Sequence, residues 1–426
     1  MFNFFLILLG RSIVLVSKFF NLGNGSTWPG HIALSINKNF IRDVLRNSKV
    51  KIILIAGTNG KTTTAKLIRT ILEYDKKSLP AHWRVFQNAA GANLLNGVVS
   101  ACIQHASWDG GLNVDYGVFE VDENSLPIVL TYVKSKAIVI LNLFRDQLDR
   151  YGEVDVIAEK FSKTTLILNA DDPQVAFLGE KSKSNVLYFG INPANKTEKN
   201  QHASDSNYCP NCGERLIYNS IYFSHLGDWI CKNCGFEHPK KTFTQSPFYP
   251  LSGTYNEYNT NAAVLLAKLN NVSNRAIEQS LRVFKPAFGR QEILKINDKK
   301  VQIFLSKNPA SFNESLKTIA NLNANNLLLV LNDRIPDGRD VSWIWDVDFE
   351  DFSSQFKNIT VTGDRAFDLG LRLKYAEFKN FQTKKNLAEA TNVALEKTLK
   401  NETLYILPTY SAMLEVRKIL TGKSIL

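Results

Sequence analysis

The sequence predicts an α/β fold, with a central nucleotide-binding domain built on a parallel sheet, an inserted four-cysteine ribbon and a second, smaller doubly wound domain. Three observations support this. Short apolar runs alternate with helical patterns along most of the chain, which favours parallel strands covered by helices on both faces. A glycine loop joins one such run to a helix at residues 51–64. Four cysteines form two Cys-x2-Cys pairs between residues 209 and 234.

Length and composition agree with a globular protein of two or three domains. The chain has 426 residues, of which 44% are hydrophobic and 21% charged. Its net charge of +11 suits an anionic ligand, an acidic partner or a membrane surface. Because the positive charge is spread along the chain without a long Lys/Arg block, it does not single out nucleic acid.

Residues 1–48 are predicted to hold an N-terminal helix, followed by a turn-rich linker at 23–30. The apolar run is too short to span a bilayer and Arg11 interrupts it, and no signal peptide is expected. Either the helix packs on its own domain, or its apolar face touches a membrane surface or a partner. The residues expected on that face are Phe5, Leu8, Leu9, Val16 and Phe20.

The stretch KIILIAGTNGKTTT, residues 51–64, predicts a strand, a phosphate-binding loop and the start of a helix, as in a P-loop ATPase. Its spacing is a shortened form of the usual motif, and the alternative is a tight turn that binds nothing. Lys61 is expected to reach the β- and γ-phosphates, and Thr62 to bind Mg²⁺. The residues expected at the nucleotide are Gly57, Thr58, Asn59, Gly60, Lys61, Thr62 and Thr63.

Polar residues follow the next predicted strands, at the edge of the sheet where α/β proteins bind ligands. In FEVDE, Glu120 ends a strand that should face the glycine loop and is the expected second Mg²⁺ ligand, with a solvated acidic loop as the alternative. Asp122 and Glu123 are neighbours that could share this role. Candidates for the substrate or metal side in NLFRDQLDRYGEVD are Asn142, Asp146 and Asp149, and a helix is expected near 154–163.

The cysteines at 209, 212, 231 and 234 form the knuckles CPNCG and CKNCG, eighteen residues apart. This spacing predicts a tetrahedral Zn²⁺ site with Cys209, Cys212, Cys231 and Cys234 as ligands. Four protein ligands leave no open position, so the zinc is expected to be structural. The alternatives are two disulfides or free thiols. The insertion is placed at about 205–240.

Later segments point to a second ligand-binding surface. Residues 251–269 are predicted to form a glycine turn, two Tyr-Asn pairs and then a helix, and Asn259 of the second pair could bond a nucleobase edge. Arg290 lies at the expected domain boundary, where it could meet phosphates or form an interdomain ion pair. The central domain is therefore assigned to 49–290 and the C-terminal domain to 291–426. The loop at 333–352 is dense in Trp and Asp. Such a loop is either part of a functional site, or a capping loop whose tryptophans fold into the core.

Taken together, GTNGKTTT, FEVDE, NLFRDQLD, LNADDP, GTYNEYN and FGRQE resemble the Mur ligase family of ATP-dependent amide ligases. The resemblance implies a central ATPase domain, a C-terminal Rossmann-like domain, and ATP and Mg²⁺ as requirements. The short segment before the glycine loop, the cysteine ribbon and DGRDVSWIWD resemble the branch of the family that acts on lipid II.

That resemblance implies amidation of the D-glutamate α-carboxylate of lipid II through an acyl phosphate, with ammonia from a separate glutaminase subunit, GatD. It implies Lys61 and Glu120 as catalytic residues, Asn259 and Arg290 at the nucleotide, and a C-terminal-domain aspartate that completes the glutaminase site. Asp346 is the candidate, with Asp340 and Asp348 left open. A cytoplasmic heterodimer is expected, acting on a substrate at the inner face of the membrane.

Two further positions come from the resemblance. Gln147 stands where peptidoglycan ligases commonly have His, which bears on a second Mg²⁺ site. Lys160 is the candidate for the carbamylated lysine that those relatives often use. Cys102 has only His105 nearby in sequence, so no glutaminase nucleophile is expected in this chain.

Two other functions compete with this hypothesis. One is an amino-acid-adding ligase like folylpolyglutamate synthase. The other is an ATPase that binds nucleic acid through its zinc ribbon, although no nucleic acid is expected as a partner, because clustered Lys/Arg is lacking.

Overall fold

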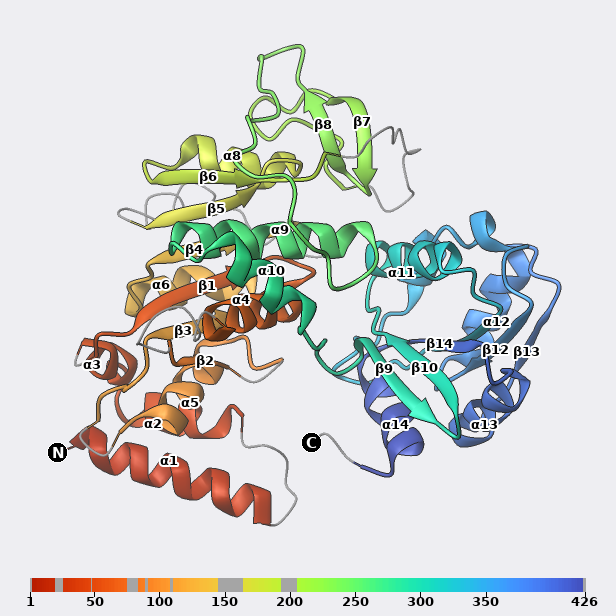
Figure 1. The fold of residues 1–426 in the computed structure, drawn as a ribbon, viewed down its shortest axis with the longest axis horizontal. Helices are drawn as coiled ribbons and strands as arrows, with labels where there is room; N and C mark the ends of the chain where they lie inside the picture. The colour runs from red at the N-terminus through yellow and green to blue at the C-terminus, as the bar shows by residue number, and fades with distance from the viewer. Residues whose placement is uncertain are drawn as a thin grey trace.

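The computed structural model describes residues 2–19, 26–46, 48–74, 83–88, 91–107, 110–144, 164–192 and 205–423. Two six-stranded sheets dominate it, and they lie side by side in Figure 1, with a two-stranded ribbon on the first. The arrangement of parallel strands and covering helices confirms the predicted α/β fold.

The first sheet is wholly parallel, in the order β2-β3-β1-β4-β5-β6. Successive side chains of β1 point to opposite faces, so Ile52 and Leu54 enter one core while Ile53 and Ile55 enter the other. The strands are β1 (Lys51–Ala56), β2 (Val85–Gln87), β3 (Tyr116–Glu120), β4 (Ala137–Ile140), β5 (Thr165–Asn169) and β6 (Asn185–Phe189).

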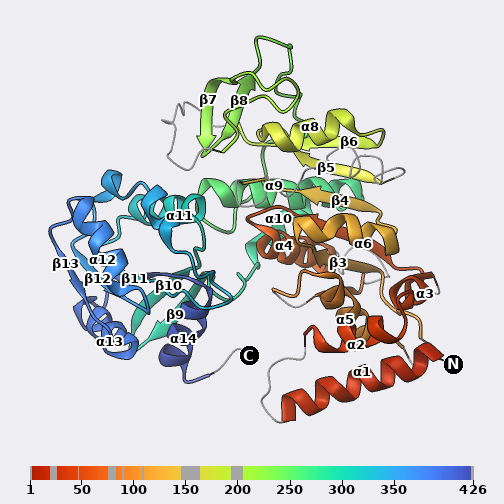
Figure 2. The same ribbon diagram turned by 180° about the vertical axis from the view of Figure 1, so that it is seen from behind.

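Helices cover both faces of this sheet (Figures 1 and 2). The core that contains Ile52 is closed by α1 (Phe2–Phe19), α2 (Trp28–Ile36), α3 (Phe40–Arg46), α5 (Leu95–His105), α6 (Leu126–Tyr132, after the short turn η2, Glu123–Ser125) and α8 (Pro173–Lys181). The core that contains Ile53 is closed by α4 (Lys61–Tyr74), α9 (Thr254–Leu269) and α10 (Asn274–Arg282).

The linker expected at 23–30 is partly wrong, because α2 already begins at Trp28. Pro29 lies in the first turn of this helix, where a missing backbone N–H costs nothing. Gly30 then allows α2 to approach α5 so closely that a Cβ at Gly30 would lie 1.9 Å from the Asn96 carbonyl oxygen.

The second sheet has the order β13-β12-β11-β14-β10-β9 and is parallel except for the edge strand β9. Its strands are β9 (Arg290–Ile296), β10 (Lys299–Phe304), β11 (Asn326–Val330), β12 (Asn358–Thr362), β13 (Phe381–Thr383) and β14 (Thr403–Pro408). The short turns η4 (Ser342–Asp346) and η5 (Phe349–Phe352) and the helices α11 (Pro309–Asn321), α12 (Ala366–Tyr375), α13 (Leu387–Lys397) and α14 (Tyr410–Thr421) cover its faces.

Candidate functional site

The glycine loop lies between β1 and α4, and Asn142 from the end of β4 fastens it. Asn142 accepts a bond from Asn59 N through Oδ1 (2.9 Å) and donates from Nδ2 to the Asn59 carbonyl oxygen (3.1 Å). Its own carbonyl accepts from Thr58 N at 3.0 Å. Asn142 therefore holds the backbone of the loop, a task that differs from the substrate or metal contact expected of it.

Lys61 is a buried cation at the start of α4. Its Nζ donates to Glu123 Oε1 at 3.0 Å and also to the Gly57 carbonyl oxygen. The other carboxylate oxygen of Glu123 is buried, and no residue in the described part of the chain forms a hydrogen bond with it. Glu123 thus holds Lys61 in place at the loop, where its positive charge faces the expected position of a phosphate.

Glu120 stands beside Thr62, as the sequence led us to expect. The Thr62 hydroxyl donates to Glu120 Oε2 at 2.6 Å, while Asn88 bonds both the N–H and the carbonyl of Glu120 at 2.9 Å. Glu120 Oε1 is buried and has no hydrogen-bond partner among the described residues, and burial raises the pKa of this carboxyl group. A buried carboxylate oxygen without a partner, next to a hydroxyl, fits a hard cation such as Mg²⁺.

Asp122 has a local partner in this region. Its side chain caps η2 by accepting from Asn124 N at 3.1 Å. Asp122 and Glu123 could have shared the Mg²⁺ site with Glu120, but Asp122 caps a turn and Glu123 forms an ion pair with Lys61.

Asn259 reaches the loop from α9. Its Oδ1 accepts from the Thr64 hydroxyl at 3.3 Å, and a Cβ at Gly60 would lie only 2.1 Å from this oxygen. Gly60 also has a φ of +91°, which only glycine adopts without strain. The close approach of α9 and the loop therefore requires glycine at position 60.

A cavity lies between the two sheets and brings together residues predicted from distant motifs. Its lining from the central part of the chain includes Asn59, Gly60, Thr63, Phe223, Tyr255 and Asn259. Its lining from the C-terminal part includes Arg290, Gln291, Lys307, Ser311 and Glu314. A ligand in this cavity would contact both parts of the molecule at once.

The cavity carries positive charge from Arg290, which is half-buried, and from Lys307, which is exposed. Burial lowers the pKa of Arg290, although the charge of Glu120 opposes that shift. Burial, with Lys61 and Arg290 nearby, lowers the pKa of Lys307 to about 8. Cations this close together are costly without a counter-ion, so the cavity is electrostatically suited to a polyanion.

Sequence reasoning missed Lys307, Asn308, Asn88 and Phe223. Lys307 lies three residues after the end of β10, and Asn308 caps α11 while its Nδ2 donates to Asn59 Oδ1 at 3.2 Å. The position after a buried strand and the Asn-Pro helix start were signals for these two. No local pattern pointed to Phe223, which comes from the ribbon.

The four ribbon cysteines converge around β7 (Ile217–Phe223) and β8 (Leu226–Ile230). Their sulfur atoms all lie within 4.8 Å of one another, with Cys209–Cys234 at 3.6 Å and Cys212–Cys231 at 3.5 Å. Sulfurs bound at about 2.3 Å to one tetrahedral zinc would be roughly 3.8 Å apart. The arrangement fits zinc, and it contains free cysteines instead of the two disulfides considered as an alternative.

The ribbon is tied to the central sheet by two buried aspartates of LNADDP. Asp171 accepts bonds from the Tyr258 hydroxyl (2.8 Å) and from Ile191 N (3.0 Å), and lies 2.7 Å from His238. Asp172 caps α8 and accepts from Leu143 N at 2.9 Å. At the hairpin itself, His225 Nε2 lies 3.4 Å from Asp172 Oδ2, and Gly227 N donates to the Asp171 carbonyl oxygen at 2.9 Å. These contacts fix the ribbon hairpin, whose Phe223 lines the cavity.

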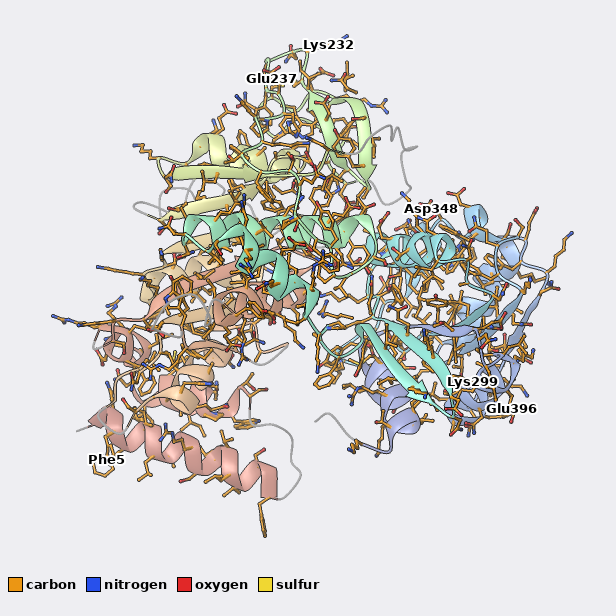
Figure 3. The ribbon with its side chains drawn as sticks, viewed as in Figure 1. Phe5, Lys232, Glu237, Lys299, Asp348 and Glu396 are labelled. Atoms are coloured by element: carbon orange, nitrogen blue, oxygen red, sulfur yellow. The ribbon has the colours of Figure 1, made fainter. Side chains whose placement is uncertain are left out.

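The three candidate aspartates of the C-terminal loop have different environments. Asp348 is buried and bonds Asn313 through both its backbone and side chain, and Figure 3 labels it near α11. Asp340 is exposed, and a bond from Ser342 N lowers its pKa. Asp346 is exposed at the end of η4. Trp343 packs on the core and Trp345 is half exposed, so the loop is only partly a core cap.

Cys102 has none of the properties of a nucleophile. It is fully buried in α5, burial raises its pKa to about 12, and His105 Nδ1 faces the carbonyl of Ala101 in its own helix. Asp146, Gln147, Asp149, Lys160 and the helix expected near 154–163 lie outside the described residues.

Comparison with known families gives two matches that together span most of the chain. The Mur ligase middle domain matches residues 55–267, and the MurT ligase C-terminal domain matches residues 305–413. The Staphylococcus aureus (strain COL) protein named "Lipid II isoglutaminyl synthase (glutamine-hydrolyzing) subunit MurT" is 34% identical over 377 residues, covering 83% of each chain. The protein of the same name from Streptococcus pneumoniae R6 is 31% identical over 454 residues, covering 98% of this chain and 97% of its own.

Solved structures share the fold. A pseudomurein peptide ligase type C from Methanothermus fervidus superposes with a TM-score of 0.66 at 25% identity, covering 90% of this chain and 81% of its own. A UDP-N-acetylmuramoylalanyl-D-glutamyl-2,6-diaminopimelate–D-alanyl-D-alanyl ligase from Acinetobacter baumannii gives a TM-score of 0.62 at 17% identity, covering 92% and 80%. With the sequence matches, these show that the chain is an ATP-dependent ligase of the Mur ligase family, in its MurT branch.

Proposed function

We propose that this chain is the synthetase subunit of an enzyme that amidates the α-carboxylate of D-glutamate in lipid II, using ammonia from a glutaminase partner, GatD. The names carried by the two bacterial relatives support the substrate and the assignment to a subunit. We further propose domain boundaries at 1–48, 49–290 and 291–426, and a location at the cytoplasmic side of the membrane, where ATP is available.

One observation carries the chemical part of this proposal. The cavity joins the glycine loop to Arg290 and Lys307, so that residues from both parts of the molecule line one site with an excess of positive charge. Such a site can hold a triphosphate against a second, anionic substrate, since the cations reduce the repulsion between them.

The proposed reaction has two steps. A carboxylate oxygen attacks the γ-phosphorus of ATP, the bond to the β-phosphate oxygen breaks, and an acyl phosphate and ADP form. Ammonia then attacks the acyl carbon, phosphate leaves, and the nitrogen loses a proton to give the amide. Phosphorylation is needed because a carboxylate oxygen is a poor leaving group.

Each site residue has a proposed role in this scheme. Lys61, Arg290 and Lys307 would bind the phosphate oxygens, the loop N–H groups from Gly57 to Thr63 would cradle them, and Asn259 would contact the nucleotide. Thr62 and Glu120 would hold Mg²⁺, which supplies charge neutralisation at the phosphates. Zinc at the four cysteines would supply stability only.

The partner is needed because ammonia must be supplied to the second step. Cys102 is buried and protonated, and the other four cysteines are grouped as metal ligands, so none is placed as a nucleophile. We propose that Asp346, exposed on the C-terminal part of the molecule, completes the active site of the glutaminase.

Co-purification with the glutaminase, followed by mass analysis of lipid II incubated with ATP and glutamine, tests the function. Conversion of an acid to an amide lowers the mass by about one unit, and replacing glutamine by ¹⁵N-amide glutamine should transfer the label. An intact complex that hydrolyses ATP but leaves lipid II unchanged would overturn the proposal. An added amino-acid residue would instead identify an amino-acid-adding ligase.

A further inference from the structure

Helix α1 has two apolar faces, and the elements that the structure describes pack against one of them. Leu6, Ile7 and Val14 are buried against α2 and α5. The opposite face is exposed: Phe5 is 62% exposed, Leu8 42%, Leu9 45%, Leu15 68%, Val16 52% and Phe19 82%. These six residues, called the outer face of α1 below, follow the helical spacing of a single stripe.

The outer face is continuous. Ser12 is the one polar residue within the stripe, and its hydroxyl bonds the Leu8 carbonyl of its own helix at 3.0 Å. From Phe5 to Phe19 the stripe is roughly 21 Å long at 1.5 Å per residue. Figures 1 and 2 show α1 at the outer edge of the molecule, and in Figure 3 Phe5 points away from the body.

The N-terminal segment that contains this apolar stripe carries a net positive charge. Residues 1–50 contain six Lys/Arg and one acidic residue, Asp43, which gives this segment a net charge of +5. Asp43 accepts bonds from Asn3 of α1 (3.3 Å) and Asn37 (3.2 Å), so the α3 region packs at the start of α1. There Lys38, Arg42 and Arg46 are exposed, and none of them forms an ion pair with any residue that the structure describes.

The attachment of α1 to the body determines how it can meet a surface. Arg11, in the middle of the helix, donates to the carbonyl oxygens of Ile103 and Ala106 of the α5 segment. Among the described residues, no helix is long and apolar enough to cross a membrane. A helix held along its length can lie flat on a bilayer, burying one face in the boundary between headgroups and acyl chains.

We propose that the outer face of α1 inserts into the surface of an anionic lipid bilayer, with Lys38, Arg42 and Arg46 contacting the headgroups. The apolar stripe supplies burial, and the net charge of +5 selects a negatively charged membrane. This inference deepens the proposed function, because an enzyme with a lipid-linked substrate would work at such a surface.

Vesicle co-sedimentation of the full chain tests the proposal. We expect binding to vesicles containing phosphatidylglycerol, at least tenfold weaker binding to pure phosphatidylcholine, and loss of binding as salt rises. The double variant Leu15→Glu/Phe19→Glu should bind phosphatidylglycerol vesicles at least tenfold more weakly, because it places charge in the apolar stripe. The matched control is Leu399→Glu, at a residue that is 66% exposed after α13, and it should bind like the unchanged protein.

Three outcomes would overturn the inference: no binding to anionic vesicles, equal binding by the double variant, or a dimer that the double variant converts to a monomer, which would assign the face to a second copy. Melting temperatures of all variants show whether they fold. Because the vesicles contain no lipid II and no glutaminase is present, the result does not depend on whether the chain amidates its substrate.

Discussion

Lys61 and Glu123 form a buried ion pair at the start of α4, and the buried Glu120 and the exposed Lys307 belong to the same group of charges. Such groups are costly to keep charged away from water. Their arrangement has a physical reason if phosphates and a cation complete it, because Glu120 and Lys307 then gain opposite charges beside the ion pair of Lys61 and Glu123.

Replacing Lys61 by Ala should reduce ATP turnover by about 100-fold or more, since one phosphate-stabilising donor is worth that much in comparable sites. The variant should also lose roughly 3 kcal/mol of stability, because Glu123 is left buried without its partner. ATPase assays and thermal melts measure the two effects.

The double variant Lys61→Ala/Glu123→Gln separates the effect on ATP turnover from the effect on stability. We expect it to recover most of the lost melting temperature but none of the turnover. Lys66→Ala, in the same helix, serves as the control and should retain activity. Recovery of turnover in the double variant would contradict a direct role for Lys61.

The lowered pKa of Lys307 predicts that the free energy of unfolding depends on pH. Its pKa is lowered to about 8 in the folded chain from 10.5, so below pH 8 the folded state must hold a charge that lies near Lys61 and Arg290 and is less well hydrated than in the unfolded state. This penalty is relieved as pH rises from about 8 towards 10.5, and Lys307→Met should therefore be the more stable form at pH 7, with the difference shrinking at higher pH.

Nucleotide binding should reverse that shift. Phosphates near Lys307 favour its charged form, so ATP binding at pH 8 should take up at most about half a proton. Calorimetry in buffers of different ionisation enthalpy measures this uptake, which Lys307→Met should abolish. The same uptake in both proteins would show that Lys307 does not meet the phosphates.

At the scale of elements, the short distance between the glycine loop and α9 restricts which residues can stand where they meet. The glycine loop and α9 meet so tightly that Gly60→Ala would place a Cβ 2.1 Å from Asn259 Oδ1 at a φ of +91°. We expect a clear loss of stability, part of which Asn259→Ala should restore by removing the clash. Gly213 has a φ of +78°, and a Cβ added there would meet no atom within 4 Å. Gly213→Ala therefore measures the cost of the positive φ without a clash, roughly 1–2 kcal/mol.

The four-cysteine ribbon is a second element whose contribution to stability can be tested. Cys209→Ser should lower zinc content well below about one ion per chain and reduce the melting temperature, because a structural site stabilises the fold only when all four ligands are present. Elemental analysis and thermal melts test this. Cys102→Ser, which changes the remaining cysteine, should keep full zinc content, and full zinc in Cys209→Ser would contradict the site.

At the scale of the whole molecule, two sheets share one cavity and present a separate loop for a partner. Asp346 is exposed on that loop, whereas Asp348 is committed to Asn313. For the complex with the glutaminase, Asp346→Asn should abolish glutamine hydrolysis while ATP binding to this chain persists. Asp340→Asn is the matched exposed control, and unaltered hydrolysis by Asp346→Asn would reject the role.

The sequence alone was sufficient for the α/β fold, the glycine loop, Glu120 beside Thr62 and the grouping of four cysteines. These depend on local spacing: strand and helix periods, a loop between them, and Cys-x2-Cys pairs that each form one knuckle. The short strands β2, β6 and β13 and the edge strand β9 were not predicted, because their pairing with neighbours, more than their own composition, makes them strands.

Only the tertiary structure decided which distant residues meet. Lys307 follows one strand among many, Phe223 lies in a ribbon some 160 residues after the loop, and neither carries a local signal for its place in the cavity. The same holds for α1, whose two apolar faces look alike in sequence until packing covers one and leaves the other in water. Local patterns specify elements, while the burial, charge and exposure of a residue depend on contacts between segments far apart in the chain.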